Sequence, residues 1–136
     1  MDEPSIVVEA YPPAAWRETV ISGLDRHNVA VTGLADYYPV GFFVFRESRE
    51  VAAGLRGDIW GGWMHIARLW VAPGLRRSGL GAALVASAHR YALAKGCTHS
   101  FLRTNSYEAR PFYEKLGYSV YAELRDHPID LIGAFS

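Results

Sequence analysis

The 136-residue sequence lacks several features that mark secreted and membrane proteins. It has a single cysteine, Cys97, so no disulfide can form within the chain, and we expect a reducing, cytoplasmic setting. No apolar run approaches the roughly 20 residues that cross a bilayer. The acidic residues 1–4 are also unlike a signal peptide, so we expect no membrane partner.

The sequence also lacks an excess of charge, because 14 lysines and arginines balance 14 aspartates and glutamates. Nucleic acids and anionic membranes need a broad basic surface, so neither is expected as a partner, although a local basic site stays open. No metal is expected, because no two of the histidines stand at metal-ligand spacing: His27, His65, His89, His99 and His127. Half of the residues are apolar, which is enough for a single domain over residues 1–136.

Apolar periodicity and turn residues predict a mixed α/β order of elements. Helices are expected over 14–25, 79–95 and 106–116, with a loop or a second short helix over 28–36. Strands are expected over 6–10, 40–46, 51–59, 63–71, 98–103 and 118–124, with a last short strand over 129–135. Three consecutive strands with short links form an antiparallel meander. We therefore expect an α/β fold in which a mixed sheet of about six to seven strands carries helices on both faces.

The stretch "VAPGLRRSGLGAALVASAHR", residues 71–90, places glycines and arginines where a strand ends and a helix begins. The first turn of a helix leaves N–H groups unpaired, and its dipole favours an anion. Gly79 and Gly81 have no side chain, so a bulky anion can approach the backbone. Arg76 and Arg77 add charge and forked donors suited to phosphate. The pattern predicts a diphosphate cradle, whereas the bland alternative is a tight turn beside solvated arginines.

Two familiar glycine-loop classes do not fit this stretch. Gly74 and Gly79 have P-loop spacing, but no lysine and hydroxyl follow them. A dinucleotide fingerprint needs a third glycine and an acidic residue about 20 positions later, and both are missing. The remaining pattern is [R/Q]-x-x-G-x-[G/A], which Arg76, Gly79 and Gly81 satisfy. It resembles the acyl-CoA-binding loop of the GNAT superfamily of N-acyltransferases.

A second stretch, "NSYEARPFYEKLGY" at residues 105–118, resembles the late helix motif of the same superfamily, N-x-x-A-x-x-x-Y-x-x-x-G-[FY]. Ala109, Tyr113, Gly117 and Tyr118 match it at the right spacing. The asparagine of the motif falls on Ser106, which can still cap the helix.

The resemblance implies a GNAT-like, centrally splayed sheet and an N-acetyltransferase that moves an acetyl group from acetyl-CoA to a primary amine by direct attack. It implies that Tyr113 protonates the departing thiolate, and that backbone groups of the strand before the loop hold the pantetheine arm. The implied cofactor-binding residues are Leu69, Trp70, Val71, Arg76, Arg77, Ser78, Gly79, Leu80, Gly81, Ala82 and Ser106.

The general base is less clearly marked. Many superfamily members carry a carboxylate or histidine nine or eleven positions before the first arginine of the loop. Those positions are Ala67 and His65 here, so His65 is the candidate base, with a purely structural histidine as the alternative and Glu108 as a fallback. In a regular strand Arg68 would point to the face opposite His65.

Two other functions stay open at this stage. The chain could be a non-catalytic acyl-CoA-binding sensor or interaction module, or a plain nucleotide binder that uses the same loop. The acceptor of the enzyme would be a small-molecule or peptide amine. A short last strand would leave a sheet edge that could pair in a homodimer. Cys97 is expected to be a core residue rather than a reactive thiol.

Overall fold

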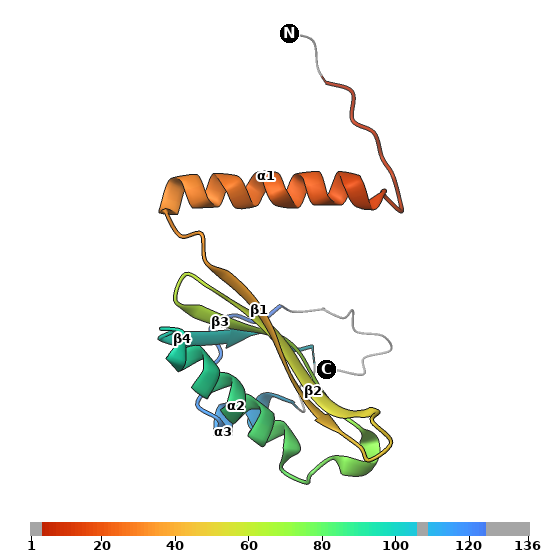
Figure 1. The fold of residues 1–136 in the computed structure, drawn as a ribbon, viewed down its shortest axis with the longest axis vertical. Coiled ribbons are helices and arrows are strands. Elements are labelled where there is room, and N and C mark those ends of the chain that lie inside the picture. Colours follow the sequence, from red (N-terminus) through yellow and green to blue (C-terminus); the bar gives the residue numbers. More distant parts are fainter. Residues whose placement is uncertain (1–3, 106–108, 125–136) are drawn as a thin grey trace. The chain divides into compact units, whose positions relative to one another are not determined.

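The structure is a computed structural model that describes residues 4–105 and 109–124 (Figure 1). The chain divides into two compact units, residues 1–36 and 37–136. Each unit is described by itself.

The first unit contains α1 (Ala14–Thr32), which is longer than the sequence predicted. It follows Pro13 and extends to Thr32, into the segment 28–36 that was predicted as a loop or second helix, because residues 26–32 hold no proline or glycine that would end it. At its end Gly33 has a φ of +74°, and its N–H donates to the Val29 carbonyl oxygen. The strand predicted over 6–10 is wrong, because these residues form no ladder with any strand of the described chain.

The second unit is built on a sheet whose four described strands follow the order β1-β2-β3-β4. The antiparallel meander was predicted correctly and comprises β1 (Tyr37–Phe45), β2 (Val51–Trp60) and β3 (Trp63–Val71). Gly61 and Gly62 form the turn between β2 and β3 with φ values of +62° and +83°, a conformation that glycine adopts readily. The last described strand, β4 (His99–Leu102), joins β3 in parallel, so the sheet is mixed.

The pairing between β3 and β4 ends halfway along β3. Its register runs from Trp63 opposite His99 to Ile66 opposite Leu102. On its other side β3 stays paired with β2 as far as Val71. Within the described part of the chain, residues 67–71 therefore have a strand on one side only, and the sheet opens between β3 and β4 beyond this point.

A bulge changes which side chains of β3 share a face. Ala67 is an extra residue in the register between β2 and β3. Asp58 and Arg56 lie two positions apart on β2 and point to the same side, so their partners His65 and Arg68 also share that side. The prediction that Arg68 points away from His65 is wrong, because it assumed a regular strand.

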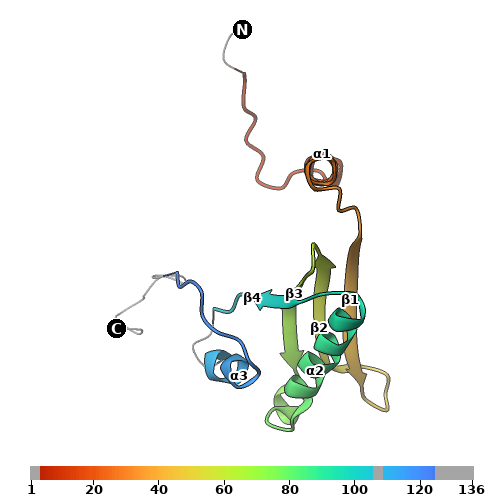
Figure 2. The ribbon, with the colours of Figure 1, turned by 90° about the vertical axis from the view of Figure 1, so that its left-hand side faces the viewer.

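The described part of the second unit has two α-helices, α2 (Leu80–Ala94) and α3 (Ala109–Lys115) (Figure 2). Both contribute side chains to one apolar cluster. α2 matches the predicted helix to within one residue at each end, and α3 lies within the predicted 106–116. Helices were predicted on both faces of the sheet, and the helix of the second face would be α1. Because α1 belongs to the other unit, its place relative to the sheet stays a prediction. Cys97 is buried in the core, as predicted, with Ala53, Leu55, Ile59, Met64, Ile66, Leu84, Val85, Ala88 and Ala92.

The chain beyond α3 does not form the strand predicted over 118–124. Tyr118 contacts β4 through a side-chain hydrogen bond to Ser100 rather than through a backbone ladder. In the described residues the sheet thus has four strands instead of six to seven. The strand predicted over 129–135 lies outside the described residues.

Candidate active site

The N-terminus of α2 lies just beyond the end of β3, after a short 3₁₀ turn, η1 (Pro73–Leu75). Gly79 precedes the helix with a φ of +85°, and no side chain caps the first turn. The N–H groups of such a turn have no acceptor within the helix, and they carry the positive end of its dipole. No acidic side chain lies in this turn. The start of α2 therefore has the electrostatics of an anion site.

The loop before α2 has two left-handed residues close together. Arg77 has a φ of +64°, two positions before the left-handed Gly79. Between them, the Ser78 hydroxyl donates to the Leu75 carbonyl oxygen. The loop residues 76–79 are exposed, so their backbone is open to a ligand.

Arg76 is bound to the end of β3. Its Nε donates to the Val71 carbonyl oxygen at 3.1 Å. This bond closes the loop between strand and helix and keeps the guanidinium beside it. It also occupies the carbonyl oxygen of one residue that was predicted to contact pantetheine.

Gly81 marks the place where α2 meets α3. A β-carbon at this position would lie 3.2 Å from Cζ of Phe112, which is closer than most real contacts of this kind. The glycine thus lets Phe112, and with it the neighbouring Tyr113, approach the first turn of α2.

Tyr113 is half-buried in the apolar cluster that α2 and α3 share. Its ring meets Phe112 edge-on at 5.0 Å and Tyr118 edge-on at 5.8 Å. Burial raises the pKa of Tyr113 above its ordinary value, and the nearby Tyr118 raises it further. The phenol therefore keeps its proton at neutral pH, which a proton donor requires.

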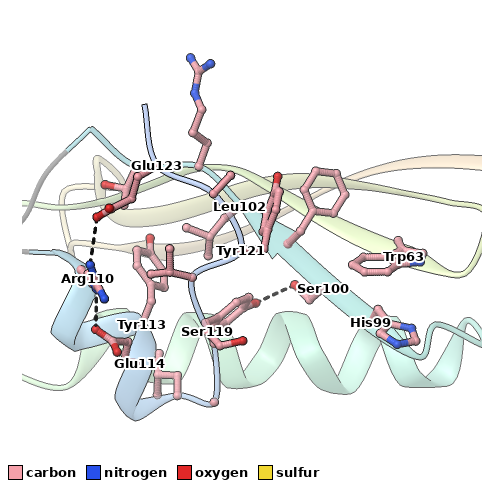
Figure 3. Close-up of a pocket in the computed structure, with 18 of the residues that line it drawn as sticks. Trp63, His99, Ser100, Leu102, Arg110, Tyr113, Glu114, Ser119, Tyr121 and Glu123 are labelled. Carbon is pink, nitrogen blue, oxygen red and sulfur yellow. Dashed lines mark hydrogen bonds and ion pairs between the residues drawn. The ribbon is translucent and has the colours of Figure 1, made fainter. Parts of the chain in front are cut away.

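Tyr113 also lines a cavity of about 1100 Å³ along β4 and the residues that follow α3 (Figure 3). On its wall, Arg110 forms ion pairs with Glu114 at 3.0 Å and with Glu123 at 3.1 Å. All three side chains are about half exposed, so these pairs add little stability. Trp63 and His99 line another part of the cavity.

His65 lies on the other face of the sheet, in the part of β3 that is paired with β4. Its Nδ1 is 3.4 Å from Oδ2 of Asp58, and its ring stacks on Phe101 with centroids 4.8 Å apart. The side chain is 36% exposed, so it can be reached by a substrate or a water molecule.

The structure does not bring the two candidate catalytic side chains to one face. Tyr113 belongs to the face covered by α2, whereas His65 alternates with the buried Met64 and Ile66 and points away from it. The cavity that Tyr113 lines also includes Phe101, on which His65 stacks, so the two side chains approach one another around β4 and at the opening between β3 and β4. Ser106 and the fallback base Glu108 lie outside the described residues.

In the described part of the chain, no three histidine, cysteine, aspartate or glutamate side chains gather as a metal site would require. Over the same residues, no helix combines the length and apolar character needed to cross a membrane.

Comparison with known proteins identifies the family. The model of the acetyltransferase (GNAT) family matches residues 8–118, which is most of the chain. The chain therefore belongs to the GNAT family of acetyltransferases.

Individual relatives agree with this assignment. The chain is 39% identical over 83 residues to blasticidin-S acetyltransferase of Streptomyces morookaense, a match that covers 60% of this chain and 61% of that protein. The crystal structure of an acetyltransferase from Bacillus cereus superposes with a TM-score of 0.77 at 26% identity, covering 90% of this chain and 89% of the other. An aminoglycoside N-acetyltransferase in complex with CoA has a TM-score of 0.59 at 17% identity, covering 80% of this chain and 86% of the other, and shares the fold.

Proposed function

We propose that this GNAT-family chain transfers an acetyl group from acetyl-CoA to a primary amine by direct attack. The observation that carries the proposal is the uncapped start of α2 beside the free edge of β3. One element offers unpaired N–H groups to a diphosphate, and the other offers unpaired backbone to an extended amide-bearing arm.

The residues fit acetyl-CoA as a co-substrate in three places. The segment 76–82 would hold the diphosphate, with Arg76 and Arg77 supplying charge and Gly79 supplying the left-handed turn. Along β3, backbone groups of alternate residues face away from β2, and these would bind pantetheine: those of Leu69 and the N–H of Val71, whose carbonyl oxygen already accepts from Arg76. The backbone groups of Trp70, which was also predicted to contact pantetheine, face β2 opposite Gly54. The thioester would then lie where β3 and β4 part.

The proposed reaction uses one group from each face. The amine nitrogen attacks the thioester carbonyl carbon, and the carbon–sulfur bond breaks. Tyr113 gives its proton to the departing thiolate, so CoA leaves as the thiol. His65 takes the excess proton from the nitrogen, directly or through water, and an amide forms. Solvent then restores the proton of Tyr113 and removes the one on His65.

The acceptor is proposed to be a small-molecule amine. Two similar proteins are named for antibiotics, blasticidin S in one case and aminoglycosides in the other. The stacked His65 and Phe101 rings beside the opening would suit a compound with a flat or apolar part next to its amine.

The test is release of free thiol from acetyl-CoA in the presence of a panel of amines, antibiotics among them. Tyr113→Phe should lower kcat by roughly 10²-fold, the effect of losing a general acid, and leave KM for acetyl-CoA unchanged. Tyr121→Phe is the matched control, because it removes an exposed hydroxyl from the same cavity. An unchanged kcat in Tyr113→Phe would remove the acid role. Tight CoA binding without thiol release would instead favour a non-catalytic module.

A further inference from the structure

We propose that Tyr118 is a positioning residue for Tyr113, held in place through its hydroxyl by His89 and Ser100. The inference rests on the proposed function, because it assigns Tyr118 to the acid of that reaction. The late helix motif accepts phenylalanine or tyrosine at this position, so the motif does not account for the hydroxyl.

The Tyr118 hydroxyl joins two elements that are distant in the sequence. It lies 2.8 Å from Nε2 of His89 on α2 and 2.6 Å from Oγ of Ser100 on β4. The hydroxyl has one hydrogen, so it donates to one of these atoms and accepts from the other. When His89 is neutral with Nε2 unprotonated, Tyr118 donates to His89, and Ser100 donates to Tyr118.

Burial supports this arrangement of protons. It lowers the pKa of His89, so the imidazole stays neutral and can accept at Nε2. Burial also raises the pKa of Tyr118, with the hydrogen bond to Ser100 acting in the opposite direction, so the phenol keeps the proton that it donates. Hydrogen bonds in such partly dry surroundings hold geometry better than exposed ones.

Tyr118 is in turn connected to Tyr113 in two ways. Its backbone N–H donates to the Tyr113 carbonyl oxygen at 3.1 Å, closing the turn through Gly117. Its ring also meets the Tyr113 ring edge-on, with centroids 5.8 Å apart at 80°. Two hydrogen bonds at its hydroxyl hold the Tyr118 ring in place. This ring therefore limits the positions that the Tyr113 ring can take.

The anchor matters because α3 is short. Its seven residues form about two turns, which have little stability of their own. The Arg110–Glu114 pair on this helix is exposed and contributes little. The Tyr118 hydroxyl instead fastens the end of α3 to α2, the helix that begins at the proposed CoA loop, and to β4.

The test is a double-mutant cycle between Tyr118→Phe and Tyr113→Phe, with thiol release as the assay. Tyr118→Phe keeps the ring and should lower kcat about threefold to tenfold, with KM for acetyl-CoA unchanged. In the Tyr113→Phe background it should have no further effect, because its influence passes through Tyr113. An equal loss in both backgrounds, or wild-type kcat in Tyr118→Phe, would overturn the proposal. Wild-type kcat in Tyr113→Phe alone would instead overturn the acid role.

Substitution of His89 separates positioning from simple destabilisation. His89→Gln can still bond the Tyr118 hydroxyl and should keep most of kcat, whereas His89→Phe should behave like Tyr118→Phe. Equal kcat values in the two His89 variants would contradict the proposal. A readout without turnover is the NMR signal of the Tyr113 ring in tyrosine-labelled protein. It should shift or broaden in Tyr118→Phe and in Ser100→Ala but not in Tyr121→Phe, and an unchanged signal in the first two would also refute the role.

Discussion

At the scale of single residues, His65 and Asp58 form a pair across β2 and β3, with Nδ1 and Oδ2 3.4 Å apart. In a hairpin with a two-residue turn at Gly61 and Gly62, two residues of β2 and β3 lie opposite each other when their numbers add up to 123. Asp58 therefore lies opposite His65. That pairing follows from the length of the turn, so Asp58 is predictable as the partner of His65. The bulge at Ala67 has no such signal, because nothing in the local residue types requires an extra residue there.

The half-buried His89 gives a prediction about pH at this same scale. Burial lowers the pKa of His89 from its ordinary value of 6.5, so the unfolded chain binds a proton more readily than the folded one. Stability from this group is therefore complete above about pH 6.5 and is lost as the pH falls through the lower folded value. Urea unfolding at a series of pH values should show this loss in the wild type.

The control for this effect is His89→Gln, which removes the titrating group but keeps a hydrogen-bonding side chain. Its free energy of unfolding should decline less below about pH 6.5 than that of the wild type. Parallel curves for the two proteins would show that protonation of His89 does not oppose folding.

At the scale of elements, prediction succeeded where a pattern was long and bounded by clear signals. The bounds of β3 were predicted without error, and α2 to within one residue at each end. Both have strong apolar periodicity and end at glycine or proline. Short apolar runs were less reliable. Residues 6–10 and 118–124 are rich in β-branched or aromatic side chains but form no ladder in the described structure, and a strand exists only when a neighbour pairs with it.

The turn that starts α2 can be tested by giving it a side chain. At Gly79 a β-carbon would meet no atom within 4 Å, so Gly79→Ala should cost only the left-handed backbone, about 1–2 kcal/mol in unfolding free energy. If the loop relaxes instead, affinity for acetyl-CoA should fall. Urea unfolding and calorimetric titration with acetyl-CoA measure the two effects.

Gly74→Ala is the matched control, because Gly74 also has open space around it but no positive φ. It should change neither stability nor affinity by a comparable amount. If Gly79→Ala behaved like this control in both measurements, the left-handed turn would have no role in binding.

At the scale of the whole molecule, stability should depend on the cluster between the sheet and α2. Leu55 is fully buried at its centre, so Leu55→Ala should lower the free energy of unfolding by about 2–5 kcal/mol. Leu93→Ala, on the same side of the sheet but 69% exposed, should stay within about 0.5 kcal/mol of the wild type. Equal losses from the two substitutions in urea unfolding would show that this cluster is not the main core of the second unit.

The family and its mixed sheet were predictable because two motifs lie at the right distance from each other along the chain. The acceptor, the homodimer and the cytoplasmic setting depend on surfaces and surroundings that residue spacing does not encode, so they stay predictions. Tyr113 and His65 were found by spacing, but their placement on opposite faces follows from packing, which only the structure shows.

The incomplete pairing of β3 with β4 also defines a length. The stretch without a partner on the β4 side, residues 67–71, is about 16 Å long at roughly 3.3 Å per residue. In the proposed complex it would separate the diphosphate end of acetyl-CoA from the thioester. One residue more or less would then move the thioester by about 3 Å relative to Tyr113, which exceeds the tolerance of a proton transfer. If acetyl-CoA binds as proposed, the number of residues in this stretch therefore sets where the reacting carbonyl lies.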